Sequence, residues 1–185
     1  ITNLSNGQTA PKANISFATD SESKSVVAGN SVTFTVKYDG TKELDAHVQK
    51  DATVDIAITI KDNNDNTHTV TVTPKEDVAA GAYTVYVYEK DDRTVQAEAK
   101  LNITEAGAKV AIGDTTTYYA TLAEILANKL TGGSTITLLK DEKNTSSGVI
   151  YINTDETGIT LDLNGKSLYY SALYVGNLQG VSGGN

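Results

Sequence analysis

Oxygen-bearing side chains follow one another in the segment 62–66, Asp-Asn-Asn-Asp-Asn, and oxygen donors are the ligands that Ca²⁺ prefers. A calcium ion bound here would take its ligands from Asp62, Asn64, Asp65 and Asn66. The segment lacks the glycine and the twelfth-position glutamate of an EF-hand loop, since Thr73 stands at the twelfth position. The alternative is a hairpin turn, because Asn and Asp tolerate left-handed backbone conformations. Apart from calcium, we expect no cofactor.

Tyrosines are the second group of residues that could bind a partner. The chain has ten Tyr against two Phe and no Trp. Exposed tyrosines stack on sugar rings or anchor protein interfaces, so the partner would be a host or cell-wall glycan or a surface protein. The alternative is structural, with one tyrosine of each pair in a core and the other covering a strand face. The candidates are Tyr118, Tyr119, Tyr169, Tyr170 and Tyr174.

Side chains for catalysis are sparse. The two histidines, His47 and His68, stand apart, Cys is absent, and Arg93 is the single arginine. No Ser-His-Asp order, P-loop or glycine fingerprint is present. An isopeptide cross-link would need a lysine, an acid and an asparagine buried together. The residues of these types that lie on strands in a suitable order are Lys37, Asp55 and Asn102, and all three occupy polar positions of their strands. We therefore expect that the chain is not an enzyme.

Charge and hydropathy exclude further classes. The 185 residues include 15 Lys and Arg against 23 Asp and Glu, a net charge of −8. This balance opposes binding to nucleic acid, which needs basic residues to neutralise phosphates, and opposes a polybasic membrane contact. No apolar run approaches the roughly 18–20 residues that span a bilayer, so we expect no membrane insertion within this chain.

The elements that would position these residues are mainly strands. Apolar and polar residues alternate over 32–38, 54–60, 69–73, 83–89 and 95–103, and residues 15–18 form a short apolar group before them. Turn signals such as Asp39-Gly40 and Ala80-Gly81 separate these runs. Period-two alternation predicts half-buried strands, and this number of strands predicts an antiparallel β-sandwich. The pattern changes near Glu105, where we place a domain boundary.

The second part contains one predicted helix, over residues 121–130. Thr121 is the expected N-cap, with Glu124 three residues on as its capping-box partner. One apolar stripe follows, and Gly132-Gly133 ends the helix. Short apolar strands are expected after it, at 135–139, 149–152, 159–163 and 172–175.

Two segments resemble known bacterial proteins. The stretch 77–83, Asp-Val-Ala-Ala-Gly-Ala-Tyr, resembles the entry to a late strand in bacterial immunoglobulin-like surface domains. The stretches 118–124, 133–141 and 159–166, the last reading Ile-Thr-Leu-Asp-Leu-Asn-Gly-Lys, resemble the opening of right-handed parallel β-helix regions in surface proteins of Gram-positive bacteria. In that family a short helix caps the open end of the coils, and residues 172–184 are similar to its later rungs.

The resemblance implies an immunoglobulin-like β-sandwich over 1–105 and the helix-capped start of a truncated parallel β-helix over 106–185. It implies a non-catalytic, extracellular module of an adhesin-like bacterial cell-surface protein, acting as a spacer and as an adhesion or ligand-presenting stalk. Two alternatives are the non-catalytic N-terminal part of a secreted polysaccharide-degrading enzyme and a purely structural stalk or lattice protein.

Overall fold

The structure is a computed structural model that describes residues 12–49, 55–128, 130–143, 148–154 and 158–176. These residues are mainly β, as the alternation predicts, with strands β1 to β16, one 3-10 turn (η1, Thr19–Ser21) and one short helix (α1, Leu122–Leu126). None of the helical residues among them forms a helix long and apolar enough to cross a membrane.

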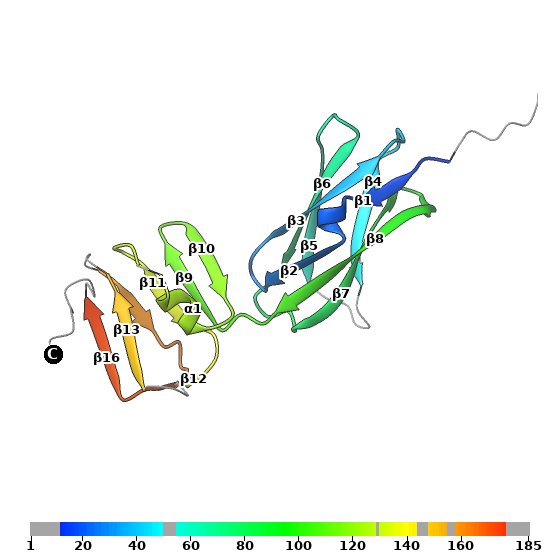
Figure 1. Cartoon of the computed structure of the whole chain (residues 1–185). Helices are drawn as coiled ribbons and strands as arrows, with labels where there is room; N and C mark the ends of the chain where they lie inside the picture. The colour runs from blue at the N-terminus through cyan, green and yellow to red at the C-terminus, as the bar shows by residue number, and fades with distance from the viewer. Residues whose placement is uncertain (1–11, 50–54, 129, 144–147, 155–157, 177–185) are drawn as a thin grey trace, which may run out of the picture.

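Two four-stranded sheets make up the N-terminal part (Figure 1). The first sheet has the order β1 (Ile15–Phe17), β3 (Val32–Tyr38), β6 (Thr67–Pro74) and β5 (Ile56–Asp62). The second has the order β2 (Ser23–Val27), β8 (Asp92–Thr104), β7 (Gly81–Glu89) and β4 (Leu44–Gln49).

The two sheets bury one shared apolar core. Phe34 and Val36 from the first sheet, and Val85 and Leu101 from the second, are fully buried in a single cluster. Each of these residues lies on the apolar phase of its strand, because successive side chains on a strand point to opposite faces. The period-two prediction is therefore confirmed for β3, β6, β7 and β8. Val54 of the predicted run 54–60 lies outside the described residues.

Two strands of this part were not predicted, and one pairing differs from the expectation. β2 has apolar residues only at its end, so its sequence carries a weak strand signal. β4 alternates Leu44, Ala46 and Val48 with polar residues and was missed despite this signal. β2 pairs with β8 in parallel, Ser23 opposite Lys100 and Val27 opposite Thr104, whereas we expected an antiparallel arrangement throughout. Backbone hydrogen bonds to residues 100–104 of β8 form this pair, and the direction of pairing leaves no mark in side-chain periodicity.

The C-terminal part begins with a hairpin that the sequence did not predict. β9 (Ala108–Ile112) and β10 (Thr115–Tyr119) pair antiparallel around Gly113, whose φ of 56° suits a tight turn. β11 (Thr135–Leu138) then pairs antiparallel with the other edge of β9. The threonine-rich sequence of β10 has no apolar alternation, which explains the omission.

The helix is shorter than predicted. α1 begins after its N-cap Thr121, whose Oγ1 accepts a hydrogen bond from the Glu124 amide at 3.2 Å, as expected. It ends at Leu126, so the predicted extent of 121–130 is wrong at its C-terminal end. The amide of Leu130 instead donates to the Asn153 carbonyl at 2.9 Å. Leu130 is buried in the second core although it lies outside the helix. Its position in the apolar stripe predicted burial but suggested a helical residue.

Three parallel strand pairs follow in the same order along the chain. β11 pairs with β14 (Thr160–Asp162), β12 (Glu142–Lys143) pairs with β15 (Leu168–Tyr169), and β13 (Val149–Asn153) pairs with β16 (Ala172–Gly176). The segment from β14 to β16 therefore retraces the segment from β11 to β13. Ile136, Leu138, Ile150 and Ile152 from the earlier segment are buried in a second apolar cluster.

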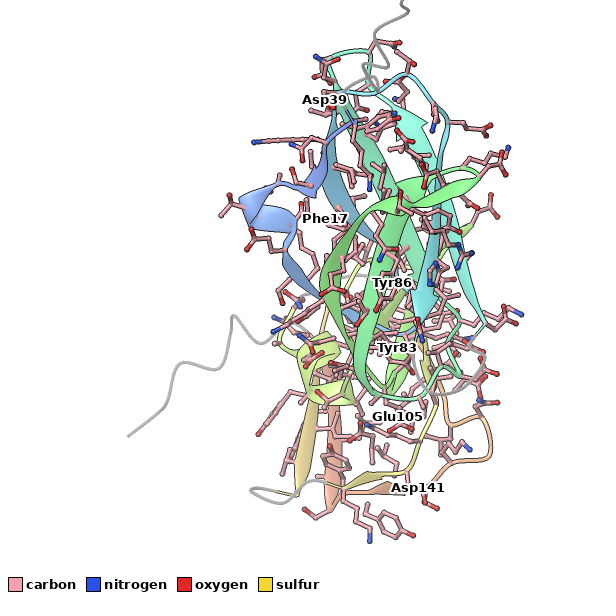
Figure 2. The ribbon with its side chains drawn as sticks, turned by 90° about the vertical axis from the view of Figure 1, so that its right-hand side faces the viewer. Phe17, Asp39, Tyr83, Tyr86, Glu105 and Asp141 are labelled. Carbon is pink, nitrogen blue, oxygen red and sulfur yellow. The ribbon has the colours of Figure 1, made fainter. Side chains whose placement is uncertain are left out.

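The two apolar clusters are separate, and the parts that contain them lie end to end (Figure 1). β8 leads into β9 at the contact between them, while β16 lies at the end remote from the sandwich. Figure 2 shows Glu105 near this contact, with Asp39 at the opposite end of the sandwich and Asp141 in the C-terminal part.

Candidate functional site

Tyr118, a predicted ligand-binding residue, lies at the contact between the two parts. Its backbone amide donates to the Asn30 side-chain oxygen at 3.0 Å, and its carbonyl accepts from the Asn30 side-chain nitrogen at 2.8 Å. Asn30 follows β2 in the sandwich, and Tyr118 belongs to β10 of the C-terminal part. One asparagine therefore satisfies both backbone polar groups of a residue in the other part.

Gly29 provides the surface against which the Tyr118 ring packs. A Cβ atom at position 29 would lie 2.5 Å from ring atoms of Tyr118, closer than any real contact. The φ of Gly29 is 94°, in the region that favours glycine. Gly29 therefore meets two demands at once, a left-handed backbone and the close approach of an aromatic ring.

An ion pair flanks the same ring. Lys109 Nζ lies 3.1 Å from Glu76 Oε2 and 5.5 Å from the centroid of the Tyr118 ring. The hydrogen bond from Lys109 lowers the pKa of the Glu76 carboxyl, and burial raises the pKa of the Tyr118 hydroxyl, which also hydrogen-bonds Glu76. We call Gly29, Asn30, Glu76, Lys109 and Tyr118 the junction. Its contacts hold the two parts together, and Tyr118 serves this contact.

The other four predicted tyrosines divide into two kinds. Tyr119 and Tyr170 pack against the second apolar core. Tyr169 and Tyr174 are exposed, at 54% and 55%. Tyr169 and Tyr174 are therefore the predicted residues whose side chains a ligand could reach, and ligand binding by them stays a prediction.

The exposed tyrosines already have aromatic or cationic neighbours. Tyr174 of β16 stacks on Tyr151 of β13, with ring centroids 5.3 Å apart and planes inclined by 15°. Lys143 Nζ lies 5.0 Å from the centroid of the Tyr169 ring. In both cases the two residues are opposite each other in a parallel pair. The stacking thus follows from the register of the parallel pair, and one face of the Tyr151 ring is covered by Tyr174.

The predicted calcium ligands lie in the loop between β5 and β6. Asp62 Oδ1 accepts from the Asn64 amide at 2.8 Å, and Asp65 Oδ1 accepts from the Thr67 amide at 3.0 Å. Asn64 and Asn66 both have a φ of 61°, the left-handed conformation that Asn tolerates. The loop forms a hairpin turn stabilised by its own carboxylates. Calcium binding at Asp62, Asn64, Asp65 and Asn66 stays a prediction.

The isopeptide candidates are not assembled. Lys37 lies on β3 and Asn102 on β8, which belong to different sheets, and both side chains are exposed. Asp55 forms an exposed ion pair with Lys75. The polar phase of these positions, visible in the sequence, accounts for their placement outside the core.

A buried carboxylate that the sequence did not point to lies at the far end of the sandwich. Glu89 is 3% exposed, and its two oxygens accept from Tyr38 Oη and Lys42 Nζ, each at 2.7 Å. The hydrogen bond from Lys42, followed by that from Tyr38, lowers the pKa of the Glu89 carboxyl. Glu89 is therefore held ionised, which suits a structural anchor and does not suit a general acid.

A polar and aromatic cluster on the outer face of the second sheet was also missed. The His47 ring stacks on Tyr86 at 4.8 Å, and the guanidinium of Arg93 lies 4.5 Å from the centroid of the Tyr88 ring. Figure 2 labels Tyr86 on this face. The sequence places Tyr86 and Tyr88 on one face of a strand, but the register that brings His47 to them is long-range. Tyr88 is covered by these neighbours and donates to Asp45.

These arrangements support packing and binding more than catalysis. Among the residues that the structure describes, no group of three or more His, Cys, Asp or Glu is placed to hold a metal ion. Both oxygens of the buried Glu89 carboxylate are hydrogen-bonded within the protein. What remains accessible is a set of exposed aromatic and aliphatic side chains near β16.

Comparison with solved structures gives weak matches that cover about half of the chain. No family model matches the sequence, and no curated protein matches it. The Escherichia coli adhesin FdeC is 18% identical with a TM-score of 0.40, over 54% of this chain and 34% of that chain. The S-layer protein rSbsC is 23% identical with a TM-score of 0.35, over 56% and 15%, respectively. Titin domains z1z2, solved in complex with telethonin, are 16% identical with a TM-score of 0.33, over 57% and 55%.

These neighbours are a bacterial adhesin, an S-layer protein and titin domains, and each match covers little more than half of this chain. The chain spans about a third of the adhesin structure and less of the S-layer structure. At these identities and TM-scores the similarity assigns no ligand, partner or activity to this chain.

Proposed function

We propose that this chain is a non-catalytic, extracellular module of a bacterial cell-surface protein, acting as a rigid spacer that carries a stalk. The observation that supports the proposal most is the junction. Two hydrogen bonds, one ion pair and one glycine–aromatic contact join parts with separate cores. Such a connection fixes the direction of the second part relative to the first, which is what a spacer requires.

The proposal divides the chain into two domains, an immunoglobulin-like sandwich over 1–105 and a coil domain over 106–185. β8 ends at Thr104 and β9 begins at Ala108, and each side has its own buried cluster. The coil domain is the start of a right-handed parallel β-helix. Its support is the ordered set of three parallel pairs, in which each strand of one turn pairs with the corresponding strand of the next.

The hairpin and helix would cap this coil. β9 covers the edge of β11 opposite to β14, and Leu122 and Ile125 of α1 are buried in the same cluster as β11 and β13. A stacked coil exposes unpaired backbone groups at its first turn, so a covering element is needed there. The amide of Leu122 donates to Glu142 Oε1 at 3.0 Å, which ties the helix start to β12.

Small-angle X-ray scattering tests the spacer role. We expect the wild-type profile to fit one elongated particle and to stay unchanged between low and physiological salt. Tyr118→Ala should broaden the pair-distance distribution, whereas Tyr119→Phe, a ring-preserving change at the neighbouring position, should leave it unchanged. A wild-type profile that requires many domain orientations would contradict the rigid spacer.

Ligand presentation by the stalk is a second proposal, supported by the exposure of Tyr169 and Tyr174. Binding to arrays of glycans and host matrix proteins would test it, with calcium and with chelator. We expect a reproducible signal that Tyr169→Ala and Tyr174→Ala reduce and that Tyr118→Ala retains. Absence of any signal would contradict ligand presentation. It would not bear on the spacer role, which the scattering experiment tests. Loss of signal with chelator would support the calcium loop at Asp62–Asn66.

A further inference from the structure

Tyr151 of β13 and Tyr174 of β16 form a stacked pair on the outer face of their sheet. The two residues are directly opposite each other in the parallel pair, and their ring centroids lie 5.3 Å apart. Ile150 and Ile152, the neighbours of Tyr151, are buried in the second core, so alternation along the strand places Tyr151 on the opposite face. Figure 1 shows β13 and β16 side by side. The register of the sheet therefore holds two phenol rings together outside the core.

Both rings of this pair are open to solvent. Tyr151 is 47% exposed and Tyr174 is 55% exposed. All ten tyrosines lie among the described residues, and the third exposed one is Tyr169, at 54%. An exposed phenol can pass its proton to water, and exposed side chains change rotamer within picoseconds to nanoseconds. The stacked pair thus has both the proton acceptor and the rotational freedom that a reaction between two rings needs.

The composition of the chain directs oxidation to its tyrosines. Cys and Met, the side chains that oxidants commonly modify, are absent, and so is Trp. A one-electron oxidant therefore finds phenols and no thiol, thioether or indole that would compete as an electron donor. Among the three exposed tyrosines, Tyr169 has Lys143 beside its ring, whereas Tyr151 and Tyr174 have each other.

From these observations we infer that Tyr151 and Tyr174 are a site of oxidative cross-linking, at which a dityrosine bond joins β13 to β16. The oxidant is hydrogen peroxide, activated by a haem peroxidase. Each tyrosine loses one electron and one proton, and the unpaired electron of the phenoxyl radical is shared with the ring carbons beside the oxygen. One such carbon on each ring forms the new carbon–carbon bond, and the hydrogens on these two carbons move to the oxygens. Hydrogen peroxide takes up the two electrons and two protons and becomes two water molecules.

The arrangement of the pair determines how this reaction proceeds. Stacked rings must turn edge to edge before the bond forms, and the exposure of both side chains permits this movement. Because the partners lie on one chain in fixed register, the coupling is intramolecular, and its rate is independent of protein concentration. The bond would close a loop from residue 151 to residue 174 and restrict the unfolded chain, as a disulfide does. This cross-link goes beyond the spacer role and does not depend on it.

Treatment of the full chain with a haem peroxidase and hydrogen peroxide tests the inference. Cleavage after lysine separates the two tyrosines, because Lys166 lies between them. We expect one linked pair of peptides, lighter than their sum by two hydrogen atoms, from a product that still runs as a monomer on a denaturing gel. Tyr151→Phe and Tyr174→Phe should each abolish this product. Tyr169→Phe is the matched control, since it removes an exposed hydroxyl beside Lys143 and should keep the wild-type yield.

Two further measurements separate the folded pair from random coupling of radicals. In denaturing urea the register is lost, so the yield of the product that links Tyr151 to Tyr174 should fall. The treated wild-type chain should unfold at a higher urea concentration than the untreated chain, whereas treatment should not shift the midpoint of Tyr174→Phe. Absence of the linked peptides in wild type, equal yields from wild type and Tyr174→Phe, or cross-links only between chains would overturn the inference.

Discussion

Gly29 shows how a single residue joins the two parts. Gly29→Ala would force a Cβ atom into the Tyr118 ring and would place alanine at a φ of 94°. We expect the loss of about 1–2 kcal/mol that a left-handed non-glycine residue costs, plus the cost of displacing the ring. Gly113→Ala is the control, because its φ is also positive but no atom lies within 4 Å of the added carbon. Urea denaturation should show a larger loss for Gly29→Ala, and equal losses would argue against ring packing at Gly29.

Glu89 gives a second prediction at the residue scale, for acid stability. Its pKa is lowered in the folded state by Lys42 and Tyr38, so its contribution is present above the ordinary value of 4.5 and is lost as pH falls through the lowered value. We expect Glu89→Gln to be less stable than wild type at pH 7 and to lose stability less steeply below pH 4.5. Glu98→Gln, exposed on β8, should keep the wild-type slope. Denaturant titrations between pH 3 and pH 7 measure both, and an unchanged slope for Glu89→Gln would contradict this role.

Single residues were predicted well where local pattern determines them and poorly where a partner is distant. The inward positions of Phe34 and Val85 follow from alternation alone. Tyr118 was predicted as a ligand-binding residue, whereas the structure places it at the junction, and its partners Asn30 and Glu76 are distant in the sequence. Alternation places Glu89 in the phase of Val85 and Val87, the buried phase of its strand. Its partners Tyr38 and Lys42 are distant in the sequence, so no local feature shows how its charge is satisfied.

At the scale of elements, α1 depends on its N-cap. Thr121→Ala removes the acceptor for the Glu124 amide and should cost about 1 kcal/mol of unfolding free energy, while Thr121→Ser should retain most of it. Thermal or urea denaturation followed by circular dichroism measures the difference. Equal loss in both variants would show that the threonine methyl group, and not the hydroxyl, matters.

Elements were predictable where their sequences alternate and were missed where the backbone alone defines them. β3, β7 and β8 follow from period-two patterns. β2 and β10 have weak patterns and form because a neighbouring strand offers hydrogen bonds. β4 is the exception, since Leu44, Ala46 and Val48 alternate with polar residues and the strand was still missed. The helix ends before Leu130, whose backbone amide bonds to the carbonyl of Asn153. This contact is distant in the sequence, so periodicity cannot reveal it.

At the scale of the whole molecule, the two parts have separate apolar cores and meet at the junction. β9 pairs with one edge of β11, and α1 is buried in the same cluster as β11 and β13. Under the proposed spacer role, the junction contacts set the direction of the second part relative to the first. The sequence indicated a β sandwich followed by a capped coil, but the direction of one part relative to the other depends on the junction contacts.

A distance measurement across the junction tests the rigid spacer most directly. Because the chain has no cysteine, spin labels at Glu98→Cys and Thr160→Cys would report one distance between exposed sites in the two parts. Pulsed electron spin resonance should give a single narrow distribution for the otherwise wild-type chain and a broader one after Tyr118→Ala. A broad distribution before any junction change would contradict the account.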